Sequence, residues 1–136
     1  YKNTQDITDL FDNSKDKIVE TKNVNELRSM YFLSKNKKFS PIPLNREEQL
    51  SDIMDIEIDQ AGRIYYVGNN WNYVSELGPS TSNAGRMLGE FNISSGTFAK
   101  SHSLSLPNQL NGRKIKLLDK DRMLVADNNG YIYVVK

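Results

Sequence analysis

An internal repeat with a period of about sixty residues constrains the fold of this chain more than any other sequence feature. Its anchors recur in the same order, as Leu44, Leu50 and Asp59 and then as Leu104, Leu110 and Asp119. The match extends past the anchors, because residues 59–70 align with residues 119–129 when one residue is deleted in the turn. In both copies an apolar strand ends in Asp, turns and restarts at Arg. A fixed period of this kind indicates supersecondary units that bury their apolar faces by stacking on one another.

The composition is that of one ordinary globular domain. The chain has 136 residues, of which 38% are hydrophobic and 26% charged, and its net charge is +1. A nearly neutral chain has no global field to attract nucleic acid or acidic membranes, so we expect neither partner. No stretch approaches the roughly 18 apolar residues of a membrane span. The chain begins at Tyr1 rather than Met, which indicates a processed or excised piece and leaves both cytoplasmic and extracytoplasmic locations open.

Short runs rich in Ile, Val, Leu and Tyr predict strands in residues 53–70 and 115–135. Residues 127–130, Asp-Asn-Asn-Gly, separate two such runs, and Asn-Gly between β-rich runs predicts a two-residue hairpin turn. In the first copy Gly62 stands where a tight turn needs a residue without Cβ. The sequence therefore predicts one hairpin in each copy.

Residues 86–92 and 97–104 predict a further strand pair, so that one period holds four strands. Applying the sixty-residue offset backwards predicts an earlier pair in residues 29–34 and 39–44, joined by a turn at 35–38. Val24, Leu27, Met30 and Tyr31 also have helical spacing, so the alternative for this part is a helix over residues 24–33. Residues 45–52 predict a helical turn, and residues 1–28 form a poorly readable N-terminal segment.

The segments at 56–67, 85–97 and 127–135 resemble the repeats of β-propeller proteins, in which each blade is a four-stranded antiparallel sheet. The resemblance covers about residues 29–136 and is to loose blades of the NHL or YVTN type, without the Trp-Asp signature of WD40 repeats or the kelch diglycine. It implies an all-β fold with about two copies of a sixty-residue blade. The alternative is an α+β domain with an N-terminal helix on an antiparallel sheet.

The number of blades that 136 residues can supply is too small for a closed propeller. Closed propellers take about 4 to 8 blades, and 136 residues supply little more than two. Three outcomes fit: a piece of a longer propeller, a propeller closed by oligomerisation, or two hairpin systems of an unrelated β-rich domain. We therefore expect the region 29–136 to belong to a larger propeller or to an oligomer.

The sequence offers little for catalysis or metal binding. His102 is the only histidine and the chain has no cysteine, so thiol chemistry and sites with two histidines are excluded within one chain. Asp119, Asp121 and Asp127 with their neighbouring Asn residues supply oxygen ligands of the kind calcium takes, but turn formation explains them more simply. We expect no catalytic residues, no metal site, no cofactor and no enzymatic activity.

The segment Asn70-Trp71-Asn72-Tyr73 is the candidate ligand site. Trp71, the only tryptophan, stands among amide side chains after a predicted strand. An indole face beside amide donors and acceptors is suited to a sugar or a peptide. The simpler interpretation is that Trp71 packs between neighbouring units.

From these observations we expect a non-catalytic binding or scaffold module that contacts a protein partner, or further propeller blades, through a propeller-like surface. Two alternatives stay open. One is a lectin-like, carbohydrate-binding oligomer whose short chains close a propeller together. The other is a scaffold fragment of a larger propeller enzyme.

Overall fold

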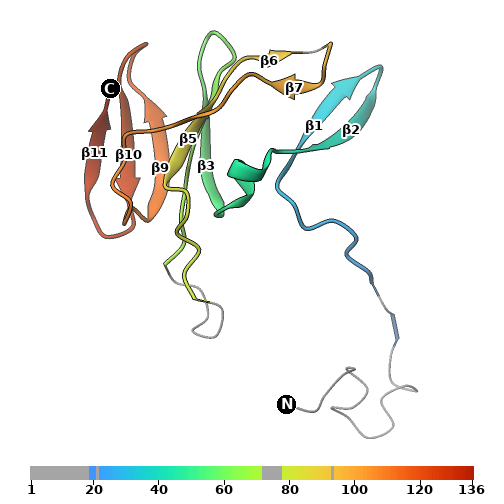
Figure 1. Cartoon of the computed structure of the whole chain (residues 1–136), viewed down its shortest axis with the longest axis horizontal. Coiled ribbons are helices and arrows are strands. Elements are labelled where there is room, and N and C mark those ends of the chain that lie inside the picture. Colours follow the sequence, from blue (N-terminus) through green and yellow to red (C-terminus); the bar gives the residue numbers. More distant parts are fainter. Residues whose placement is uncertain (1–18, 21, 72–77, 93) are drawn as a thin grey trace, which may run out of the picture.

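The fold consists of small antiparallel sheets (Figure 1). The computed structural model describes residues 19, 20, 22–71, 78–92 and 94–136, and these contain strands and one short 3-10 helix but no α-helix. The elements are β1 (Met30–Lys35), β2 (Lys38–Pro43), η3 (Arg46–Gln49), β3 (Ile53–Ile58), β4 (Ile64–Gly68), β5 (Gly85–Leu88), β6 (Phe91–Asn92), β7 (Thr97–Phe98), β8 (His102–Ser103), β9 (Gly112–Leu117), β10 (Met123–Asp127) and β11 (Ile132–Val135). The expected all-β class is confirmed.

The central sheet has four strands in the order β3-β4-β5-β8, all antiparallel. Side chains alternate along β4 and β5, so that Tyr65 and Val67 point to one face while Tyr66 and Leu88 point to the other. All four side chains are buried. The chain segment that follows β5 and the segment that precedes β8 form the short strand pair β6-β7. The predicted strand pair at 86–92 and 97–104 thus exists, but it is divided where Gly89 lies against Ala99.

A second sheet has three strands in the order β11-β10-β9. Figure 1 shows it beside the central sheet, and β9 lies against β3 and β4. Ile115, Met123, Val125 and Val135 from this sheet form one core with Tyr65 and Val67 of the central sheet. The hydrophobic effect therefore holds the two sheets face to face.

The earlier strand pair exists as the hairpin β1-β2, with Lys35 paired to Lys38. Asn36 and Lys37 have φ angles of 54° and 61°, the positive values that a two-residue turn demands. The alternative helix over residues 24–33 is wrong, because β1 begins at Met30 and the part before it that is described has no helical turn. Pairing between β1 and β2 stabilises this segment instead.

An aromatic cluster attaches this hairpin to the β6-β7 pair. The ring of Tyr31 meets Phe91 and Phe98 edge to face at centroid distances of 5.1 and 4.9 Å. Its hydroxyl also donates a hydrogen bond to the main-chain oxygen of Gly96. Edge-to-face packing of this kind stabilises the cluster beyond what burial of the ring surface contributes.

Two local expectations about turns need correction. The turn after β10 is not a two-residue turn, because Asp127 pairs with Tyr131 around three residues and only Gly130 has a positive φ, of 89°. The two Asp turns are also equal in length, since Ile58 pairs with Ile64 and Leu117 with Met123. No residue is deleted from the second turn; its aspartate stands one place later in the loop. The expected helical turn in residues 45–52 is confirmed as η3.

Candidate functional site

The repeated turns after β3 and β9 are stabilised in the same way. Asp59 accepts hydrogen bonds at Oδ1 from the main-chain N–H groups of Ala61 and Arg63, both at 2.9 Å, and its Oδ2 lies 2.6 Å from Arg63 Nε. Asp119 accepts from Arg122 Nε at 2.8 Å. In each copy an aspartate therefore folds the turn and pairs with the arginine that opens the next strand.

The charges of these turns are neutralised locally. The hydrogen bond from Arg122 is the main reason that the pKa of Asp119 lies below its usual value. Burial acts to raise the pKa of Asp59, but the main-chain and side-chain hydrogen bonds of Arg63 outweigh it and lower the pKa overall. Both carboxylates are thus held ionised and paired, as turn-forming groups are.

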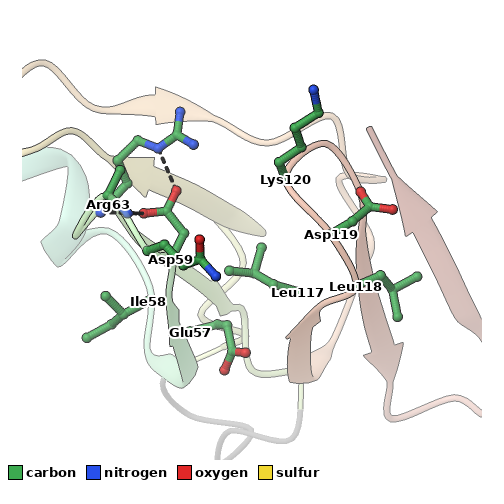
Figure 2. Close-up of a pocket in the computed structure, with 10 residues that line it drawn as sticks. Glu57, Ile58, Asp59, Arg63, Leu117, Leu118, Asp119 and Lys120 are labelled. Carbon is green, nitrogen blue, oxygen red and sulfur yellow. Dashed lines mark hydrogen bonds and ion pairs between the residues drawn. The ribbon is translucent and has the colours of Figure 1, made fainter.

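A groove of about 470 Å³ lies between the two turns. Figure 2 shows Ile58 and Asp59 on one wall and Leu117, Leu118 and Asp119 on the other. Leu117 points into the hollow, whereas Ile58, which is 61% exposed, and Leu118, which is 49% exposed, point outward on the far sides of the two walls (Figure 2). We call this hollow the turn groove. Its mixed apolar and charged lining is typical of protein contact surfaces.

Of the four predicted ligand residues, the structure describes Asn70 and Trp71. Trp71 follows β4 and is 42% exposed. Asn70 exchanges two main-chain hydrogen bonds with Ser80, at 2.6 and 2.8 Å, and its side chain donates to Asp52 at 3.1 Å. Asn72 and Tyr73 lie outside the described residues.

Trp71 opens onto a second hollow, of about 380 Å³. Among the described residues, its other lining residues come from the segment before β9 and the β10-β11 turn and are all amides: Gln109, Asn111, Asn128 and Asn129. We call this hollow the amide pocket. Sequence reasoning did not place these four residues beside Trp71. The signal was present in the repeat alignment, in which Asn128 and Asn129 stand opposite Asn69 and Asn70.

Asn69 explains why Trp71 meets residues forty positions later. Its side chain is fully buried, and its Nδ2 donates to the main-chain oxygen of Leu110 at 2.9 Å. Its Oδ1 accepts from the main-chain N–H of Asn83 at 3.0 Å and from Ser51 Oγ at 3.1 Å. The end of β4 is therefore fastened to the segment that enters β9, and Trp71 is carried with it.

Among the groups that often signal catalysis, Glu48 and Tyr66 are buried in contacts within the fold. His102 is exposed on β8. The buried carboxylate of Glu48 lies 3.4 Å from Arg86 Nε, and the Arg86 guanidinium also donates to Ser101 Oγ at 2.9 Å. Burial raises the pKa of Tyr66, whose hydroxyl accepts from Asn83. These contacts fasten η3 and its flanking loop to the central sheet.

Within the described ranges no three His, Asp or Glu side chains gather as metal ligands would. No helix among the described residues is long and apolar enough to cross a membrane.

Comparison with protein-family models, with curated proteins and with solved structures finds no match. The function must therefore be argued from the surfaces of this chain.

Proposed function

We propose that this chain is a non-catalytic binding module, built from stacked propeller-like units, that contacts a protein partner through the turn groove. The observation that carries the proposal is the way the two sheets stack. The main-chain N–H of Ile115 donates to Asp55 Oδ2 at 2.8 Å, and Lys114 lies 3.1 Å from Asp55 Oδ1. Lys116 pairs with Glu57 in the same way at 2.5 Å.

These pairs join residues 59 or 60 positions apart, which is the repeat period itself. Equivalent strands of successive units thus lie side by side, and the turns that follow them, at Asp59 and Asp119, come to one edge. Propeller blades are arranged in this way around their axis. This arrangement supports a propeller-like interpretation of the two sheets.

A protein partner suits the turn groove better than a small ligand does. The groove is formed by two turns whose aspartates are already paired with arginines, so few polar groups remain to orient a small molecule. Leu117 offers apolar area inside the groove, and the exposed side chains of Ile58 and Leu118 extend that area on either side of it (Figure 2). Apolar centres with charged rims are a common form of protein interface.

Affinity capture with groove variants tests the proposal. We expect the wild-type chain to capture a partner from an extract of its native source and the Leu118→Asp variant to fail to capture it. The variant would bury a carboxylate in the interface, which is unfavourable. Ile132→Asp is the matched control, since Ile132 is 69% exposed on β11 and does not line the groove. A photo-crosslinker at Gln60, which lines the groove, should link to the same partner. Retention of every partner by Leu118→Asp would refute the proposal.

A further inference from the structure

We propose that the amide pocket binds a neutral carbohydrate. This site is separate from the turn groove, because the two hollows share no lining residue. The inference therefore goes beyond contact with a protein partner and stands or falls independently of it.

The chemistry of the lining selects a neutral, hydroxyl-rich ligand. None of the five described residues that line it, Trp71, Gln109, Asn111, Asn128 and Asn129, carries a charge. A carboxamide offers two donor hydrogens and an acceptor oxygen, which matches the mixed donor and acceptor character of sugar hydroxyls. An anionic ligand would instead need Arg or Lys at the site.

Trp71 supplies the apolar part of the site. The indole is 42% exposed and borders the same hollow as the amides, so part of its surface is open to a ligand. A large rigid aromatic side chain gains contact area at low entropic cost. The C–H face of a sugar ring can lie on such a surface while its hydroxyls reach the amides.

Asn111, which lines the same hollow, has an unpaired side-chain oxygen. Asn111 is only 2% exposed, and its Oδ1 is buried without a hydrogen-bond partner. Buried polar atoms of this kind are rare in native structures, because leaving them unpaired is costly. Because this oxygen has almost no accessible surface, the Asn111 side chain has to turn toward the hollow before a ligand hydroxyl can donate to it.

The main chain around the pocket is already held in place. The N–H of Asn128 donates to the main-chain oxygen of Asn111 at 2.9 Å, and that of Asn129 donates to Asp127 Oδ1 at 3.0 Å. The exposed side chains of Asn128 and Asn129 are thus presented from a fixed turn. Such preorganisation lowers the entropy lost on binding.

Tryptophan fluorescence gives a direct test, because Trp71 is the only tryptophan of the chain. The intact chain is titrated with methyl glycosides of glucose, galactose, mannose and N-acetylglucosamine. We expect at least one of them to shift the indole emission saturably, with a dissociation constant of about 1 mM or below. A glycan array carrying the same sugars then distinguishes free saccharides from terminal residues of larger glycans.

Variants assign the binding to the pocket. We expect the double variant Asn128→Ala and Asn129→Ala to weaken the glycoside about tenfold, the scale of a lost hydrogen bond or two. Neither position has a positive φ, so alanine fits the backbone. Trp71→Ala, followed by calorimetry, should weaken binding at least as much. Asn45→Ala, an exposed asparagine that does not line the pocket, should leave it unchanged.

Two results would overturn the proposal. One is the absence of any emission change up to about 100 mM of each glycoside, a hundred times the expected dissociation constant. The other is binding that the double variant and Trp71→Ala leave intact, because the sugar would then occupy another surface. Saturable binding of an uncharged peptide in place of every sugar would assign the pocket to a different ligand class and would also refute it.

Discussion

Asn69 shows how a single side chain can set the geometry of a site. It stands at a φ of 70°, a left-handed conformation that asparagine tolerates better than most residues. From there its amide satisfies main-chain groups of Asn83 and Leu110, which belong to two other loops. The position of Trp71, two residues further on, depends on those bonds.

We therefore expect Asn69→Ala to lower the free energy of unfolding by about 2–4 kcal/mol, since it leaves buried main-chain groups unpaired and places alanine at positive φ. Asn69→Gly should recover about 1 kcal/mol of that loss, because glycine removes the conformational penalty alone. Urea unfolding measures both. Asn45→Ala, at an exposed asparagine, should change stability by less than about 0.5 kcal/mol. Equal losses for the alanine variants at 69 and 45 would contradict the role of Asn69.

Asp55 gives the stability of the chain a dependence on pH. Burial acts to raise its pKa, but hydrogen bonds from the Ile115 main chain and from Lys114 outweigh it, so the pKa falls below its ordinary value of 3.8. The folded carboxyl thus binds a proton less readily than the unfolded one. Its contribution to stability is complete above about pH 4 and is lost as the pH falls below that value.

Replacing Asp55 by Asn tests this directly. The amide can still accept from the Ile115 N–H but no longer carries the charge that attracts Lys114. We expect Asp55→Asn to be less stable than wild type at pH 7, and the difference to shrink as the pH is lowered to 3. Urea midpoints at several pH values measure the gap. A gap that stays constant across the range would show that the charge of Asp55 does not stabilise the fold.

At the scale of single elements, the sequence predicted most strands and several turns correctly. Runs of β-branched and aromatic residues are a local signal, so β3, β4, β9, β10 and β11 fell where expected. The split at Gly89 and the three-residue turn before Tyr131 were missed, because they depend on contacts between strands. Trp71 was predicted as a site residue, whereas Gln109 and Asn111 join it only through the packing of one sheet on another.

Gly62 and Gly68 differ in why they must be glycine. Gly62 has a φ of 78° and open space where a Cβ would lie, so only its backbone conformation requires glycine. A Cβ on Gly68 would lie 2.5 Å from the main-chain oxygen of Asp52 and 2.8 Å from that of Asn83. The requirement at Gly68 is therefore the close approach of neighbouring segments.

Substitution at the two glycines should reflect this difference. We expect Gly62→Ala to cost about 1 kcal/mol, and Gly62→Asn less, because asparagine tolerates positive φ. Gly68→Ala should cost about 2 kcal/mol or more, because two main-chain segments must move. Thermal and urea unfolding would rank the three variants. A Gly68→Ala protein as stable as Gly62→Asn would show that the approach of Asp52 is loose.

For the whole molecule, the repeat predicts equivalent positions but not equivalent environments. Ile56 pairs with Tyr66 across the first hairpin, and Ile115 pairs with Val125 across the second. Ile115 is 1% exposed because the central sheet covers it, whereas Ile56 is 52% exposed. Ile56 borders an apolar hollow of about 450 Å³ near the β1-β2 hairpin. A sequence repeat contains no information on which of its copies is covered.

The difference in exposure between Ile56 and Ile115 predicts different losses of stability when each is replaced by alanine. Ile115→Ala should lower the free energy of unfolding by about 3 kcal/mol, because it opens a cavity between the sheets. Ile56→Ala should cost less than about 1 kcal/mol, because the side chain is already half in solvent. Urea unfolding at two protein concentrations tenfold apart measures both. If Ile56→Ala costs as much as Ile115→Ala, and more at the higher concentration, a second copy of the chain covers the face around Ile56 in solution. If Ile56→Ala costs as much as Ile115→Ala and the cost does not change with concentration, a segment of the same chain covers that face.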